Sequence, residues 1–134
     1  MKPITAGQSG RFEHLVEASH SASNFGNAGV EVLATPVLCH WFETTAVIAI
    51  HDQLESGEAT VGTRLSIEHL KATPIGMRVT VEARVDAVDG RRISLRIEAR
   101  DEKEPIARGT HERMVVQLDR FLDGVRAKRG TTPA

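Results

Sequence analysis

The chain has 134 residues, the size of one domain with its own hydrophobic core. Hydrophobic residues make up 40% of it and charged residues 26%, and the net charge of -1 excludes a strongly basic surface for nucleic acid or an anionic membrane. The single cysteine, Cys39, excludes an internal disulfide, and residues 1–10 lack the apolar segment of a signal peptide. We therefore expect a soluble, cytoplasmic protein with one domain over residues 11–128 and tails at residues 1–10 and 129–134.

The first expected elements are a short strand and a long helix. Residues 11–19 are typical of a strand, and the loop "SHSASNFGNAG" follows. Thr35 is suited to cap a helix, and Pro36 then falls at the first helical position, where its missing N–H does no harm. Between residues 37 and 54 apolar side chains lie nearly all round, which predicts burial on most sides, and Gly57 is a suitable stop.

After the helix, the sequence changes to the alternation of β-strands. In residues 60–70, "TVGTRLSIEHL", the odd positions are the more apolar, which places His69 on the apolar face. Residues 77–88 alternate in the same way. Asp89-Gly90 then predicts a tight hairpin turn, with a return strand carried by apolar positions from 93 to 99.

A last strand and a short helix complete the expected elements. The strand, residues 105–118, alternates less cleanly, which suggests a bulge or burial on both faces, and residues 119–128 predict a short amphipathic helix. A helix that is apolar all round needs a sheet to cover it, and a sheet with one apolar face needs a helix. The sequence therefore predicts an α+β hotdog fold, a curved antiparallel β-sheet wrapped around a long central helix.

Three polar residues would converge in such a fold: Thr35, Glu43 and His69. Each also has a structural interpretation, since Thr35 can cap the helix, His69 can be a core histidine bound to a carbonyl, and Glu43 can pair with His40. A carboxylate with little solvent should have a raised pKa and be a strong base when ionised. A nearby imidazole can carry a proton, while a hydroxyl and helix N-terminal amides can hold a carbonyl that gains charge. Together these groups favour acyl transfer to water.

Other kinds of site fit the sequence less well. His40, His51 and His69 are too dispersed for a zinc site, so no metal is expected. Cys39 lies on the apolar helix, which favours a small buried side chain over a nucleophile. The chain has no G-x-S-x-G motif, phosphate-binding glycine loop or dinucleotide fingerprint, so no cofactor is expected.

Four segments, "LATPVLCHWFETTAV", "GEATVGTRLSIEHLKATPIGM", "GRRISLRIEARD" and "ARGTHERMVV", together resemble the fluoroacetyl-CoA thioesterase family of the hotdog superfamily. The resemblance implies an acyl-CoA substrate and a homodimer whose sheets join so that each site lies at the subunit interface, while the net charge predicts no nucleic-acid or membrane partner. The resemblance also implies a catalytic set of Thr35, Glu43 and His69, with Gly62 as a backbone donor to the thioester oxygen. The expected substrate-binding residues are Gly62, Thr63, Phe25, Pro36 and Cys39.

The expected function is hydrolysis of a small acyl-CoA thioester, with Glu43 as base or nucleophile, assisted by His69 and Thr35. The loop before Thr35 has Phe25 as its only aromatic residue, which favours a more open pocket than one closed over a fluoroacetyl group. The alternative is a non-catalytic hotdog module that binds acyl-CoA or a related ligand. A hotdog dehydratase is less favoured because its D-x-N-P-x-H type of arrangement is missing.

Overall fold

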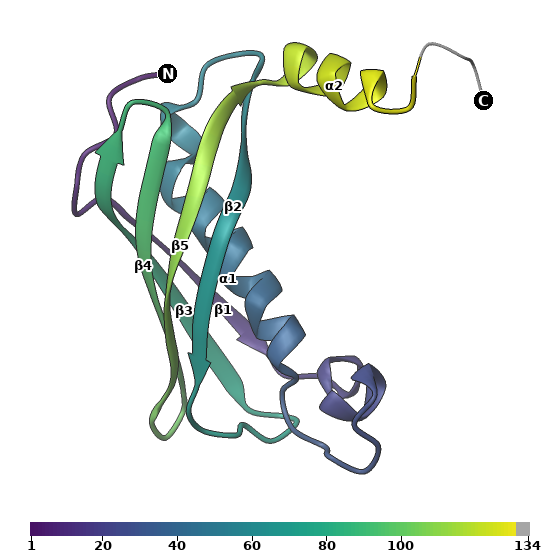
Figure 1. The fold of residues 1–134 in the computed structure, drawn as a ribbon. Helices are drawn as coiled ribbons and strands as arrows, with labels where there is room; N and C mark the ends of the chain where they lie inside the picture. Colours follow the sequence, from purple (N-terminus) through teal and green to yellow (C-terminus); the bar gives the residue numbers. More distant parts are fainter. Residues whose placement is uncertain (131–134) are drawn as a thin grey trace.

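A computed structural model describes residues 1–130 as a five-stranded antiparallel sheet wrapped around one long helix (Figure 1). The elements in chain order are β1 (Ser9–Leu15), the 3-10 turns η1 (Ala18–His20) and η2 (Ala22–Phe25), α1 (Thr35–Ile50), η3 (His51–Gln53), β2 (Glu58–His69), β3 (Arg78–Asp89), β4 (Arg92–Asp101), β5 (Pro105–Gln117) and α2 (Leu118–Ala127). The strand order β1-β3-β4-β5-β2 leaves β1 and β2 at the two edges. This is the α+β hotdog architecture that the sequence predicts.

The first residues contact the body of the protein. Ile4 is buried in the core, and the amino group of Met1 donates a hydrogen bond to Glu58 Oε2 at 3.1 Å. Strand β1 begins at Ser9, two residues before the expected start, and ends at Leu15. The expected C-terminal tail, residues 129–134, lies mostly outside the described residues.

Helix α1 begins at Thr35 and ends at Ile50, where η3 continues the turn. The residue at the N-cap is Ala34, whose side chain makes no capping hydrogen bond, and Thr35 already lies within the helix. The interpretation of Thr35 as the cap is therefore wrong. Its hydroxyl instead makes a hydrogen bond to Nδ1 of His69.

One face of α1 fills the concave side of the sheet. Leu38, Phe42, Ala46 and Ile50, spaced four residues apart, are fully buried. They share the core with inward-facing strand residues, among them Val79, Val81, Ile93, Leu95 and Ile97. Burying a side chain of this size stabilises the fold by about 1.5–3 kcal/mol relative to leaving it exposed.

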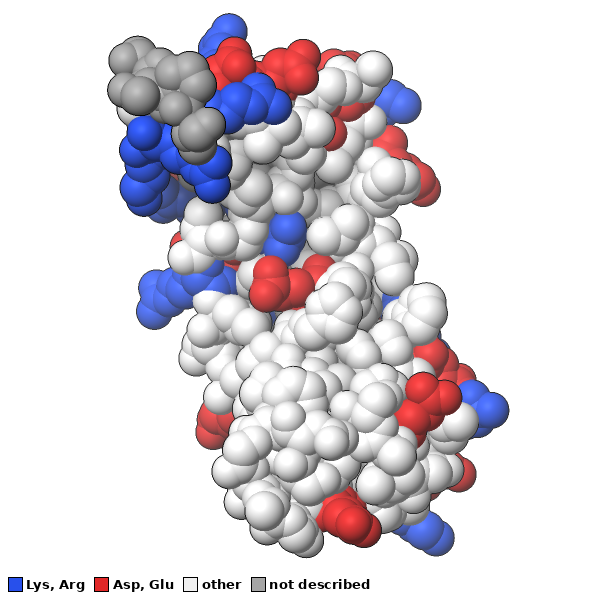
Figure 2. Space-filling view, turned by 90° about the vertical axis from the view of Figure 1, so that its right-hand side faces the viewer, with Lys and Arg blue, Asp and Glu red and all other residues white. Residues whose placement is uncertain are grey.

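The opposite face of α1 is not covered by the chain's own sheet. Ile48 remains 45% exposed, and the side chain of Glu43 remains 48% exposed. The expected burial holds for eight of the 16 helix residues, and the exception is the side that carries Glu43, which the five strands do not cover. Figure 2 shows a mostly uncharged face with acidic and basic groups near its centre.

A bulge in β2 changes which of its residues face α1. Gly62 pairs with Arg113 and Arg64 pairs with Glu112, so Thr63 is an extra residue without a partner in β5. The expected continuous alternation is therefore reversed at residues 60–63, where Thr60 and Gly62 face inward, whereas His69 faces inward as expected. The inward residues of β2 are Glu58, Thr60, Gly62, Leu65, Ile67 and His69. The irregularity expected in the last strand is confirmed as well, because Pro105 pairs with Arg100 and Ala107 with Ala99, which leaves Ile106 as an extra residue in β5.

Strand β5 approaches β2 closely at Gly109, which pairs with Ile67. A Cβ at Gly109 would overlap the carbonyl oxygen of Ser66, a backbone atom that cannot move without shifting β2. We expect Gly109→Ala to lower the free energy of unfolding by at least about 3 kcal/mol, measured by thermal or urea unfolding. The matched control is Gly124→Ala in α2, where an added Cβ meets no atom within 4 Å. The control should raise stability by up to about 1 kcal/mol, and equal losses in both variants would contradict the prediction.

The imidazole of His14 in β1 stacks on the buried ring of Trp41, with centroids 4.1 Å apart. Burial, assisted by the nearby charges of His20 and His40, lowers the pKa of His14 from 6.5 to about 4. As the pH falls, the imidazole of the unfolded chain is protonated before that of the folded chain. The contribution of His14 to the free energy of unfolding is therefore fully present above about pH 6.5 and decreases as the pH drops towards about 4. His14→Phe keeps the stacking but has no group to titrate. Between pH 6.5 and 4 we expect its free energy of unfolding to fall by about 1–2 kcal/mol less than that of the wild type, a figure reduced for the partial exposure of His14. Urea unfolding at both ends of the range tests this, and an unchanged pH dependence would contradict it.

The C-terminal helix α2 confirms the expected amphipathic segment. Figure 1 shows it extending away from the body beyond β2, and none of its residues is buried. Within the described residues, no helix is long and apolar enough to cross a membrane.

Candidate functional site

Thr35 and His69 meet where the start of α1 lies against the end of β2. Thr35 Oγ1 and His69 Nδ1 are 2.8 Å apart, so the structure brings these two predicted residues together. The other ring nitrogen, Nε2, is buried and has no hydrogen-bond partner within residues 1–130. Burial lowers the pKa of His69, opposed by a backbone hydrogen bond at Lys71. The imidazole is therefore neutral at neutral pH and can accept a proton.

A shallow groove of about 220 Å³ opens beside this pair. Besides Thr35 and His69, its lining includes Ala22, Asn27, Val30, Leu33, Leu70 and Lys71. Phe25, expected to bind substrate, does not line this groove and is 49% exposed at the end of η2. Pro36 is exposed next to Thr35. The groove in one protomer is thus open, largely uncharged and without an aromatic wall.

Glu43 lies eight residues after Thr35, about 12 Å further along the helix axis. No hydrogen bond or ion pair within residues 1–130 joins it to His40 or His69, so the expectation of a partner among these histidines is wrong for one protomer. Its partner is instead Arg113, whose Nη1 donates to Oε2 at 3.5 Å. The carboxylate lies over Gly62, where an added Cβ would be 3.0 Å from Oε2.

The exposure of Glu43 also corrects the expectation of a carboxylate with little solvent. Its side chain is 48% exposed, whereas that of Arg113 is 7% exposed. Glu43 projects from the face of α1 that the sheet does not cover, and only one of its oxygens contacts the buried cation. One side of the carboxylate thus contacts Arg113, and its other side is open to solvent.

Two buried residues of β5, His111 and Arg113, were not predicted. Nδ1–H of His111 donates to the carbonyl of Arg64 at 2.7 Å, which leaves Nε2 to accept from Arg113 Nη1 at 3.1 Å. Burial lowers the pKa of His111, and the charge of Arg113 adds to this effect. His111 is therefore a neutral acceptor that fixes the guanidinium plane.

Arg113 connects β5, β2 and α1. Its Nε donates to the hydroxyl of Thr60 and its Nη2 to the carbonyl of Thr60, both at 2.9 Å. With the contacts to His111 and Glu43, the N–H donors of the guanidinium link residues of three elements. The sequence does contain a signal, because His111 and Arg113 are in phase with the apolar positions Ala107 and Val115. A charged and an ionisable residue on the buried face of a strand point to a site.

The remaining predicted residues lie between these two groups or beside them. Cys39 is half-buried on the same stripe of α1 as Thr35 and Glu43, four residues from each. Burial raises the pKa of its thiol, and the charge of Glu43 adds to this, so Cys39 is a poor nucleophile at neutral pH. The hydroxyl of Thr63, the extra residue of the bulge, donates to the carbonyl of Glu112 at 3.3 Å.

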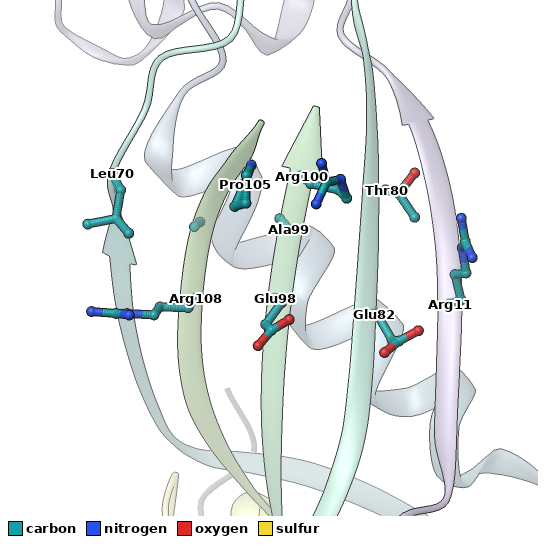
Figure 3. A pocket seen from close by; sticks show the side chains of 10 residues that line it. Arg11, Leu70, Thr80, Glu82, Glu98, Ala99, Arg100, Pro105 and Arg108 are labelled. Atoms are coloured by element: carbon teal, nitrogen blue, oxygen red, sulfur yellow. The ribbon is translucent and has the colours of Figure 1, made fainter. Parts of the chain in front are cut away.

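A separate hollow of about 370 Å³ lies on the outer face of the sheet (Figure 3). Charged and polar side chains from four strands line it, including Arg11, Thr80, Glu82, Glu98, Arg100 and Arg108. None of the predicted catalytic residues is among them. The chemistry described above belongs to the concave side of the sheet.

Comparisons with known proteins agree with this fold. The family model described as fluoroacetyl-CoA-specific thioesterase matches residues 16–119. A fluoroacetyl-CoA thioesterase from Streptantibioticus cattleyicolor is 43% identical over 104 residues, which cover 78% of this chain and 73% of the relative.

Solved structures give the same result. A variant of the fluoroacetyl-CoA-specific thioesterase in complex with fluoroacetate and CoA is 34% identical, with a TM-score of 0.82 over 88% of this chain and 99% of the other. A thioesterase superfamily member from Thermus thermophilus is 27% identical, with a TM-score of 0.91 over 96% of each chain. Residues 16–119, which the family model matches, include α1, all of β2 to β5, the pair Thr35 and His69, and the residues Glu43, His111 and Arg113. This chain belongs to the fluoroacetyl-CoA-specific thioesterase family.

Proposed function

We propose that the protein hydrolyses a small acyl-CoA thioester to the free acid and CoA, in the cytoplasm, as a homodimer. The observation that carries the proposal is the hydrogen bond between His69 of β2 and Thr35, which lies on the same stripe of α1 as Glu43, in a member of a thioesterase family. A hydroxyl, a neutral imidazole and a carboxylate are the groups that acyl transfer to water requires.

The proposed homodimer forms through the β2 edge. β2 is an unpaired edge strand next to the uncovered face of α1. A two-fold axis perpendicular to the sheet would pair two β2 strands antiparallel and bring the two uncovered helix faces together. Each Glu43 would then have a second copy of Thr35 and His69 within reach.

We assign the catalytic roles as follows. Glu43, paired with Arg113 at 3.5 Å, acts as base towards water or attacks the thioester carbonyl itself. When Glu43 acts as base, His69 of the partner subunit accepts the proton that Glu43 has taken from water and passes it to the departing CoA thiolate. Thr35 of the partner subunit and the amide of Gly62 hold the carbonyl oxygen, and Cys39 contacts the acyl group.

A thiol-release assay with a panel of acyl-CoAs, from acetyl to long-chain and aromatic and including fluoroacetyl, tests the activity. Release of free CoA from the short-chain members supports the proposal. Tight binding of CoA esters without thiol release would overturn it in favour of the non-catalytic binding module. Preference for fluoroacetyl-CoA over acetyl-CoA would contradict the assignment of an open groove.

A mixed dimer tests the sharing of residues between protomers. One protomer carries Glu43→Gln and the other carries His69→Ala. If each site takes Glu43 from one protomer and His69 from the other, one site of the mixed dimer is intact. We then expect about half the wild-type activity per mixed dimer, whereas each homodimer variant is inactive. An inactive mixed dimer would show that both residues act within one protomer.

A further inference from the structure

Helix α2 has an apolar stripe that its own chain covers only in part, since Phe121 and Leu122 are half-buried. The stripe consists of Leu118, Phe121, Leu122 and Val125, whose spacing of three and four residues places them on one side of the helix. Leu118 is 41% and Val125 52% exposed. A helix of 10 residues is not stable in water without packing, so the stripe needs a second surface.

The position of α2 indicates which surface that is. The N–H of Leu118 donates to the carbonyl of Gly57 at 2.9 Å, and Gln117 pairs with Glu58, so α2 starts beside the first residue of β2. In an antiparallel pair of β2 strands, the start of one strand lies beside the end of the other. The end of β2 is His69, followed by the segment 70–72 that borders the groove.

The length of α2 is sufficient to reach that segment. Its 10 residues extend about 15 Å, roughly three strand spacings, and Figure 1 shows them running out beyond β2 on the side where a partner would pair. The stripe of one protomer would therefore lie against residues 70–72 of the partner. Leu70, which is 51% exposed, offers an apolar contact there.

Helix α2 carries positive charges at its end, whereas the groove has few. Among the residues that line the groove, Lys71 alone carries a positive charge. CoA carries a pyrophosphate and a ribose phosphate, so its recognition requires several cations. Arg126, Lys128 and Arg129 lie at the free end of α2, where no acidic residue follows Asp123 within the described residues, and Arg126 makes an exposed ion pair with Asp123 at 3.3 Å. On the helix, Arg126 and Lys128 flank the stripe on its two sides.

We propose that α2 of each protomer packs its stripe on residues 70–72 of the partner and that Arg126, Lys128 and Arg129 bind the phosphates of CoA in the partner's groove. The inference rests on the homodimer and the substrate class proposed above. Each active site would thus contain a phosphate-binding helix supplied by the other chain.

Kinetics with a full and a truncated substrate test the phosphate contacts. The variant Arg126→Ala/Lys128→Ala/Arg129→Ala is compared with the wild type on an acyl-CoA and on the same acyl group carried by N-acetylcysteamine, which has no phosphates. We expect kcat/KM for the acyl-CoA, divided by kcat/KM for the N-acetylcysteamine ester, to be at least about tenfold lower in the variant than in the wild type. This is the scale of one or two lost charge-assisted contacts. The matched control, Arg11→Ala/Arg84→Ala/Arg96→Ala, removes the same charge on the outer face of the sheet and should keep the wild-type ratio. An unchanged ratio in the first variant, or an equal fall in the control, would overturn the proposal.

If the wild type hydrolyses neither substrate, the proposed function fails, and binding decides the inference separately. Adenosine 3',5'-bisphosphate, which carries two of the phosphates of CoA, is titrated into the wild type and the variant. Binding that is at least about tenfold weaker in the variant supports the phosphate site. Equal binding, or none to either protein, overturns it.

An engineered disulfide tests the docking of α2 on the partner. In a Cys39→Ser background, Val125→Cys is combined with Ala72→Cys, and the control combines Val125→Cys with Arg84→Cys on the outer face of the sheet. We expect a covalent dimer on oxidation of the first pair and none with the second. A dimer in solution that does not cross-link would overturn the docking of α2 alone. A monomer by light scattering would overturn the homodimer as well.

Discussion

Glu43→Gln is expected to lower the turnover of a susceptible acyl-CoA by at least about two orders of magnitude, the scale of losing a general base. The amide keeps the shape of the side chain and its contact with Arg113 but cannot accept a proton from water or attack the carbonyl. Because the Glu43 side chain is 48% exposed, the change should leave the free energy of unfolding within about 0.5 kcal/mol of the wild type. Thiol release and urea unfolding measure the two effects.

The control for this prediction is His40→Gln on the same helix. His40 is exposed and makes no hydrogen bond to Glu43 within the described residues, so this variant should retain wild-type turnover. A Glu43→Gln protein that turns over at the wild-type rate would remove Glu43 from the catalytic set. Loss of activity together with loss of folding would place Glu43 among the residues that stabilise the fold.

Arg113→Met is expected to lower the free energy of unfolding by about 2–4 kcal/mol. Methionine fills part of the space but leaves the hydroxyl of Thr60 and Nε2 of His111, both bound by Arg113, without their partner. It also removes the cation beside Glu43, so turnover should fall in addition to stability. Urea unfolding and thiol release at a temperature where the variant is fully folded separate the two losses.

Arg108→Met is the matched control, since Arg108 lies three residues before His111 in β5, on the outer face, and pairs with the exposed Glu68 at 3.2 Å. Exposed pairs of this kind contribute about 0–1 kcal/mol, so this variant should be close to the wild type. Equal free energies of unfolding for the two variants would mean that the hydrogen bonds of the Arg113 guanidinium do not stabilise the contact between β2 and β5.

The fold could be predicted from the sequence because its largest signals are local. The apolar run that became α1, the Asp89-Gly90 turn and the alternating residues of β3 and β4 each specify one element by short-range chemistry. A buried helix and a one-sided sheet then leave few ways to pack. These features are enough to give the antiparallel sheet around a central helix.

The site was predicted in part, and its errors have physical causes. His69 was placed on the inward face because its alternation with Leu65 and Ile67 is intact, whereas Gly62 was misplaced because a bulge inserts one residue without changing the composition. Arg113 was missed because a buried arginine depends on partners from three elements. The exposure of Glu43 depends on which face of α1 the sheet covers, and a helix that is apolar all round does not specify that face.

The bulge at Thr63 has a consequence for the behaviour of the chain before it finds a partner. A straight, exposed edge of 12 residues would be a template for open-ended strand addition, the route by which sheets grow into aggregates. Thr63 interrupts that edge near its midpoint, so a foreign strand could match only half of it at a time. A second copy of β2, bent at the same place, would fit both halves at once, which makes self-pairing selective over aggregation.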